Sequence, residues 1–223
     1  MDQAVNDMRA RIAQLGAWLY DRHLTDAAGG NISALVGDKV CITPRYSGSK
    51  RQWQLVPEDV LVADLDMNVL EGAGQISREA KAHFSLYKTF GHIGTSVIHA
   101  HPRNLLVFAA LSQPMPPVLE ATRKFGVTPV VEYAPAHSKT LAENIVESIR
   151  GREERIKVQA VGTIAPWHGL FVMGKDLDAA FDAVERFDTN AYIILMSRLL
   201  GSAETLESQR QLMDTTITNF KEA

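Results

Sequence analysis

Val97-Ile98-His99-Ala100-His101-Pro102 is the stretch that decides the fold of this chain and the position of its chemistry. The apolar residues at its start predict a buried strand, which the proline ends. Side chains in a β-strand alternate between faces, so residues two positions apart point the same way. The two histidines therefore converge at the strand end. They indicate either a metal site or two histidines satisfied by hydrogen bonds.

A third histidine stands far downstream, in Ala165-Pro166-Trp167-His168-Gly169. If the fold brings it to the strand end, three imidazoles surround one point and leave a coordination position open. Three nitrogen ligands with one exchangeable position are typical of a catalytic divalent metal rather than a structural one. The sequence thus offers His99, His101 and His168 as metal ligands.

Composition indicates the class of protein. The 223 residues, 46% of them hydrophobic, suit one globular domain over residues 1–223. The net charge of -3 argues against a nucleic-acid surface. Cys41 is the only cysteine, which excludes a disulfide within the chain and fits a reducing cytoplasm. Residues 1–16 lack a signal-peptide core, and charges interrupt the apolar segment 177–200, so we expect a cytoplasmic protein that does not enter membranes.

Hydrophobic periodicity and turn signals predict a helix, a run of hairpin strands, and then strands mixed with helices. Gly37-Asp38 is a two-residue hairpin signal between two apolar runs. This order predicts an α/β fold of three α/β/α layers, with a mainly antiparallel central sheet covered by helices. Helices are expected over 5–19, 77–90, 102–111, 141–150 and 177–200, and strands over 32–36, 39–43, 60–65, 69–72, 96–101, 127–133, 158–161 and 170–173.

Six short motifs in order resemble the class II aldolase/adducin family over roughly residues 5–200. The family includes fuculose- and rhamnulose-phosphate aldolases, ribulose-phosphate 4-epimerase, and sugar-phosphate dehydratases and decarboxylases. The resemblance implies that the three histidines hold a divalent metal, usually zinc, with manganese or another divalent ion in some members. The motifs are Gly30-Asn31-Ile32-Ser33, Ile42-Thr43-Pro44, Pro57-Glu58-Asp59, Ser77-Arg78-Glu79, His99-Ala100-His101-Pro102 and His168-Gly169.

Glu79 is the candidate acid or base. By resemblance it supplies a carboxylate beside the metal, and a useful one must be tuned by burial and neighbours. The residue pattern alone also fits an acid that complements a helix N-terminus. The residue at this position also distinguishes members of the family, since the aldolases carry glutamate there and the epimerases carry aspartate.

Substrate recognition is expected from polar residues in turns, whose N–H groups and hydroxyls can hold an anion. By resemblance these are Asn31, Thr43, Ser47, Gly48 and Ser77. The loop after the threonine is longer than the family's common form, and an arginine replaces the second of two common serines. These added cations either make charge-assisted contacts to a phosphate or carboxylate or remain solvated. They are Arg45, Arg78, Lys50 and Arg51.

A second acid or base is less clearly marked. Fuculose-phosphate aldolase places a tyrosine about twenty residues after its histidine pair, donated across a subunit interface. Here the corresponding neighbourhood holds Glu120, which is either a proton shuttle or a surface carboxylate. The tail also lacks a tyrosine beyond Tyr192. The leading hypothesis is a metal-dependent lyase of class II aldolase type that acts on a small sugar-phosphate-like substrate. Decarboxylase and dehydratase are the alternatives, and a non-catalytic adducin-like binding protein is less favoured.

Further features concern the surroundings of the site and the assembly of subunits. His83 either orients Glu79 or is a buried helix histidine, and His137 lies in a loop that borders the site. Trp167 is expected to pack and fix the loop before His168. The resemblance implies a C4 homotetramer with active sites at subunit boundaries. We expect a neighbouring subunit to cover three apolar residues, Val118, Leu119 and Phe125.

Overall fold

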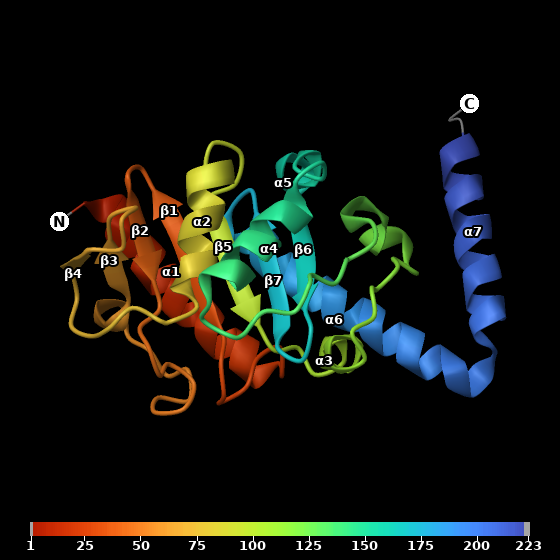
Figure 1. Cartoon of the computed structure of the whole chain (residues 1–223), viewed down its shortest axis with the longest axis horizontal. Helices are drawn as coiled ribbons and strands as arrows, with labels where there is room; N and C mark the ends of the chain where they lie inside the picture. The colour runs from red at the N-terminus through yellow and green to blue at the C-terminus, as the bar shows by residue number, and fades with distance from the viewer. Residues whose placement is uncertain (1, 221–223) are drawn as a thin grey trace.

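The computed structural model describes residues 2–220 and is built on a seven-stranded sheet (Figure 1). The strand order is β4-β3-β2-β1-β5-β7-β6, and every neighbouring pair is antiparallel. The predicted antiparallel sheet covered by helices is therefore confirmed. The strands are β1 (Asn31–Val36), β2 (Lys39–Ile42), β3 (Leu61–Ala63), β4 (Val69–Glu71), β5 (Ser96–Ala100), β6 (Ala160–Ala165) and β7 (Gly169–Gly174).

Helices cover both faces of the sheet, and each face has its own apolar cluster. Residues of α1, α3 and α6 pack on one face, and residues of α2, α4 and α5 on the other. Figure 1 shows α2 and α4 in front of the sheet and α6 behind it. No helix within the described residues is long and apolar enough to cross a membrane. The helices are α1 (Gln3–Asp21), α2 (Ala80–Phe90), α3 (Leu105–Ala110), α4 (Lys139–Ile149), α5 (Glu154–Val158), α6 (Leu177–Leu200) and α7 (Ala203–Asn219), with short 3₁₀ turns η1 (Pro57–Asp59) and η2 (Glu120–Phe125).

The central strand β5 is buried on both faces, which explains its apolar sequence. Its alternation sends Val97 into the cluster under α2 and α4, and Ile98 into the cluster under α1 and α6. His99 shares the face of Val97 and stacks on Phe171 of β7, with ring centroids 4.1 Å apart. The strand therefore carries its first histidine directly into the hydrophobic interior.

Several predicted elements have different boundaries, among them α2, which begins at Ala80 rather than Ser77, and one predicted strand does not form. Residues 127–133 make isolated bridges rather than a strand, and Pro129 within them has no N–H to give to a ladder. The helix predicted from residue 102 begins at Leu105, where Asp188 of α6 accepts the N–H groups of Asn104 and Leu105. The strand predicted from Val158 begins at Ala160, because Val158 closes the short helix α5.

The C-terminal helix α7 was not predicted from the sequence. Ser202 caps it by accepting the N–H of Thr205 at 3.1 Å, and none of its described residues is buried. In Figure 1 it stands away from the sheet beyond the end of α6. Arg123 of η2 holds it through an ion pair of 2.6 Å with Asp214.

The expectation of a neighbour covering Phe125 is wrong for that side chain. Phe125 is 1% exposed within its own subunit and contacts Phe187 of α6, with ring centroids 4.8 Å apart. Val118 is half-buried against the same core. The segment before η2 folds back on α6, where Asn190 accepts the N–H of Val118 at 2.9 Å.

Candidate active site

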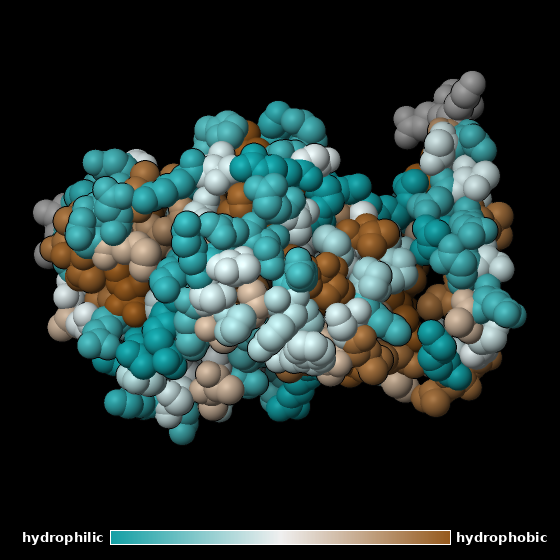
Figure 2. Space-filling model, in the orientation of Figure 1, coloured by the Kyte–Doolittle hydropathy of each residue, from teal (hydrophilic) through white to brown (hydrophobic). Residues whose placement is uncertain are grey.

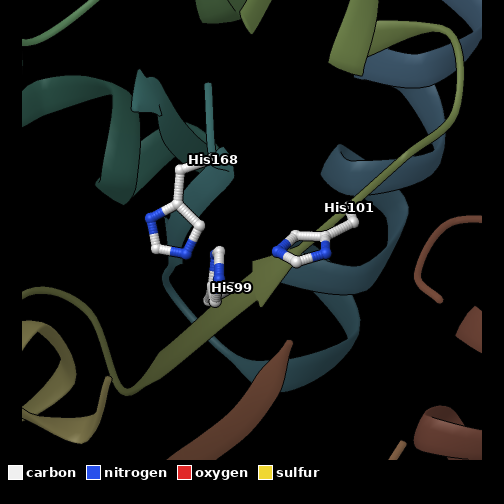
Figure 3. Close-up of side chains that lie close together, drawn as sticks. All are labelled: His99, His101 and His168. Atoms are coloured by element: carbon white, nitrogen blue, oxygen red, sulfur yellow. The ribbon is translucent and has the colours of Figure 1, made fainter. Parts of the chain in front are cut away.

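Three histidines from two distant segments meet at one end of the central strands (Figure 3). His99 lies in β5, His101 directly follows it, and His168 ends the turn between β6 and β7. One ligand nitrogen from each ring lies within 4.8 Å of the other two. The ring centroids of His99 and His168 are 4.7 Å apart, and those of His99 and His101 are 5.0 Å apart. The convergence predicted from the His-x-His pattern is confirmed.

Two glycines leave room for these rings. A Cβ on Gly29 would lie 2.5 Å from Cε1 of His101. A Cβ on Gly169 would lie 2.7 Å from Cδ2 of His101 and 3.2 Å from Cε1 of His99. These distances are shorter than van der Waals contact, so a larger residue at either position would displace one of these histidines.

Hydrogen bonds fix how two of the rings face the site. His99 Nδ1 donates to the carbonyl of Leu170 at 3.0 Å, and His101 Nδ1 lies 3.1 Å from Oδ1 of Asp26. Because a carbonyl only accepts, the proton of His99 is on Nδ1 and the lone pair of Nε2 is free. The Nε2 atoms of His99 and His101 are buried and have no hydrogen-bond partner among the described residues. Such nitrogens fit a metal ion.

The electrostatics of the cluster favour neutral imidazoles. Burial, with the nearby His168 and His101, holds the pKa of His99 well below its usual range. Burial also lowers the pKa of His168 to about 4, with smaller effects from His101 and His137. Neutral imidazole is the form that binds a metal, so near neutral pH His99 and His168 can bind one without losing a proton.

Glu79 lies beside the histidines, as the sequence suggested. Its side chain is almost fully buried, and Oε1 lies 3.7 Å from Nε2 of His168. The same oxygen accepts the N–H of His137 at 3.0 Å and lies 2.6 Å from Nδ1 of that ring. Burial raises the pKa of Glu79, and His137 opposes this rise. The carboxylate has the buried position and the polar partners that a tuned acid or base requires.

A small polar cavity of about 180 Å³ adjoins this carboxylate. Four of the five residues expected to hold an anion line it, and Thr43 does not. Thr43 is buried and accepts the N–H of Ile32 at 3.1 Å, so it fixes β1 instead. Asn31 donates to Ser77 at 2.7 Å, and its Oδ1 is buried without a hydrogen-bond partner in residues 2–220. The predicted residues that line the cavity are Asn31, Ser47, Gly48, Ser77 and Arg78.

The added cations divide between the cavity and the loop surface. Arg45 and Arg78 line the cavity. Nε of Arg45 is buried without a hydrogen-bond partner in the described chain. Arg51 instead pairs with Asp59 at 2.5 Å, and Lys50 lies over the ring of Tyr46. Two arginines therefore give the cavity a positive charge.

Two other candidates lie away from the metal ligands in this subunit. Glu120 begins η2 and lines a separate cavity of about 850 Å³ between η2 and α7. His83 is fully buried, and its Nδ1 lies 2.7 Å from Oγ of Ser33. His83 is thus a core histidine rather than the group that orients Glu79. Trp167 is 66% exposed and packs on Tyr133, with ring centroids 4.9 Å apart.

Sequence reasoning missed Asp26 and gave His137 no role. Asp26 is 75 positions from His101, and His137 is 58 positions from Glu79. No local pattern marks such partners. The available signal for Asp26 was its place just before Gly29-Gly30, where an Asp side chain accepts turn N–H groups, as it does from Ala28 and Gly29.

A protein-family model described as Class II Aldolase and Adducin N-terminal domain matches residues 10–195. The chain belongs to this family. Class II aldolases use a divalent metal, and the three-histidine site is in place for one. The protein is accordingly an enzyme of the lyase type found in this family.

Several relatives of the chain are named as sugar-phosphate enzymes. An L-fuculose phosphate aldolase of Methanococcus maripaludis strain S2 is 32% identical over 168 residues, which is 75% of this chain and 84% of the relative. The L-ribulose-5-phosphate 4-epimerase UlaF of Salmonella paratyphi C is 26% identical over 70% of each chain. A solved structure of an L-fuculose 1-phosphate aldolase superposes with a TM-score of 0.77 at 26% identity, covering 93% of this chain and 96% of that one.

Proposed function

We propose that the protein is a divalent-metal-dependent class II aldolase that cleaves or forms a C–C bond next to the carbonyl of a small ketose phosphate. One observation carries this proposal. A buried carboxylate, Glu79, lies 3.7 Å from Nε2 of His168 within a cluster of three histidines. An ion-binding site next to a proton-transfer group is what reversible aldol chemistry needs.

When bound, a divalent ion would polarise the substrate carbonyl and stabilise the negative charge that develops on its oxygen. His99, His101 and His168 would hold the ion, with zinc as the first candidate and manganese as the second. Glu79 would move the proton at the carbon next to the carbonyl. The buried position of Glu79 keeps bulk water from competing for that proton.

The proposed substrate class follows from the cavity beside Glu79. Arg45 and Arg78 line that cavity and suit a phosphate. L-fuculose 1-phosphate, which the aldolase of known structure is named for, has its carbonyl at C2. Aldol cleavage of its C3–C4 bond gives dihydroxyacetone phosphate and lactaldehyde. A phosphate at one end and a carbonyl two atoms away match a cavity that adjoins a metal site.

The experiment is product analysis with the metal-loaded protein. We expect L-fuculose 1-phosphate to yield lactaldehyde and dihydroxyacetone phosphate, and we expect Glu79→Gln to abolish this while metal stays bound. Cleavage of other ketose phosphates but not this one would change the proposed substrate and leave the proposed reaction unchanged. A protein that binds metal but turns over no ketose phosphate, aldose phosphate or sugar acid would contradict the proposal and favour a non-catalytic adducin-like role.

Decarboxylation or dehydration of a sugar acid or sugar phosphate is the second candidate. It is motivated by Glu120, which stands where the aldolases carry tyrosine, and by Arg78, which also suits a carboxylate. Release of carbon dioxide would indicate a decarboxylase, and loss of water without carbon cleavage a dehydratase. Unchanged turnover in Glu120→Gln would remove the reason for both.

We also propose a homotetramer of C4 symmetry, formed by single-domain subunits in the cytoplasm. Large apolar side chains are exposed where α6 meets α7, among them Leu199, Leu200 at 96% exposure, and Leu212. Figure 2 shows hydrophobic surface gathered in this region. Such a surface supports burial by another copy of the chain. The single, buried and unpaired Cys41 is consistent with a reducing compartment.

A further inference from the structure

His137 occupies a loop with an unusual backbone. Its φ is 70°, in the left-handed region that residues other than glycine rarely adopt. Two neighbours hold it there. Lys81 of α2 donates to its carbonyl at 3.0 Å, and the adjacent Ser138 is the cap of α4, where its Oγ accepts the N–H of Leu141 at 3.0 Å. Strained residues fixed by their surroundings cluster at functional sites, so the contacts of this side chain are informative.

Both the backbone and the ring of His137 reach the same oxygen of Glu79. The N–H donates to Oε1 at 3.0 Å, and ring Nδ1 makes an ion-pair contact of 2.6 Å with that oxygen, although the angles are not those of a hydrogen bond. Nε2 of His168 is also nearest to Oε1, at 3.7 Å. No hydrogen bond from the described residues reaches Oε2. Oε1 of the carboxylate is therefore held by neighbouring residues, and Oε2 is free to transfer a proton.

His137 also lines the anion cavity, together with Asn31, Ser77 and Arg78. It thus contacts Glu79 on one side and the cavity on the other. A substrate that bridges the cavity and the metal site would pass along this edge. The position suits a residue that sets the direction of the carboxylate relative to the substrate.

We propose that His137 is a positioning residue that holds Oε1 of Glu79 and thereby presents Oε2 to the substrate carbon next to the carbonyl. This inference rests on the proposed aldolase function. In the direction of bond formation, the proton on that carbon moves to Oε2. The electron pair of the C–H bond stays with the carbon and delocalises into the carbonyl. A correctly oriented base increases the rate strongly, because a small misplacement lowers the rate by about a hundredfold.

The test compares His137→Ala and His137→Asn with the exposed control His92→Ala. Asparagine tolerates the left-handed backbone and can place an amide near the position of Nδ1, whereas alanine keeps only the backbone N–H. Two rates are measured on metal-loaded protein. They are cleavage of L-fuculose 1-phosphate, and the exchange of carbon-bound protons of dihydroxyacetone phosphate in D₂O followed by NMR.

For His137→Ala we expect kcat and the exchange rate to fall together by about tenfold to a hundredfold, with KM and bound metal nearly unchanged. We expect His137→Asn to recover part of the loss and His92→Ala to match the wild type. Unchanged kcat in His137→Ala, or a fall that follows loss of metal, would overturn the inference. If the wild type turns over neither these two compounds nor any other ketose phosphate, the proposed function fails instead. Crystal structures of metal-loaded wild type and His137→Ala give a second test. A Glu79 carboxylate that keeps its place without the imidazole refutes the positioning role.

Discussion

Replacing Asp26 should weaken metal binding without removing a metal ligand. Oδ1 of Asp26 lies 3.1 Å from Nδ1 of His101, and the hydrogen bond between them lowers the pKa of Asp26. A carboxylate that accepts from a ligand histidine fixes the ring and increases its basicity. Loss of this contact therefore leaves His101 free to rotate and makes it a poorer donor.

The size of the effect follows from the exposure of the carboxylate. A hydrogen bond to a charged group contributes about 1.5–3 kcal/mol when buried. The side chain of Asp26 is 47% exposed, so solvent screening reduces this to about 1–2 kcal/mol. Since 1.4 kcal/mol is a factor of ten, Asp26→Ala should raise the Kd for zinc by about five- to thirtyfold.

Asp26→Asn separates charge from geometry. The asparagine amide oxygen can still accept from His101 and from the turn N–H groups of Ala28 and Gly29, so its Kd should lie between those of the wild type and Asp26→Ala. The assay is competition with a chromophoric chelator, with Asp66→Ala as the control, since Asp66 pairs with Lys88 at the surface. Equal affinity for zinc in the wild type and Asp26→Ala would refute the reasoning.

Three other changes probe the site and the core beneath it. Gly29→Ala should lower metal content, measured by elemental analysis, because its Cβ would lie 2.5 Å from Cε1 of His101; wild-type content would contradict the packing argument. Phe171→Ala removes the ring that stacks on His99 and should cost about 3–5 kcal/mol in urea unfolding, whereas a cost below about 1 kcal/mol would contradict that role. Burial lowers the pKa of His83 to about 3, so between pH 6.5 and 3 the unfolded chain binds the additional proton and stability falls as pH falls. The free energy of unfolding of the apoprotein should fall by about 2–3 kcal/mol from this group between pH 6.5 and 4.5. His83→Gln should show a shallower decline, and equal slopes in the two proteins would contradict the prediction.

Elements whose evidence is local were predictable from the sequence. The alternation around His99 defines β5, and Gly37-Asp38 defines the first hairpin, because both signals lie within a few residues. Residues 127–133 contain β-favouring residues, but Pro129 removes a donor and the segment forms isolated bridges. Helix α7 has a polar sequence and buries none of its described residues, so it lacked the apolar positions that identified the other long helices.

The same distinction holds within the site. The clustering of the three histidines was predictable because His101 directly follows the strand that holds His99, and the motif order added His168. The contacts of Asp26 with His101 and of His137 with Glu79 were not, since each joins residues that are far apart in sequence. Partners of this kind are set by tertiary packing, which no residue pattern records.

The central claim is that His99, His101 and His168 hold a catalytic divalent metal, and metal analysis of the purified protein tests it most directly. We expect one zinc or manganese ion per chain in the wild type. His99→Ala and His168→Ala should lose it, while His92→Ala, which changes an exposed histidine, should retain it. A native protein that remains metal-free after incubation with zinc and manganese, or full metal content in His99→Ala and His168→Ala, would contradict the account.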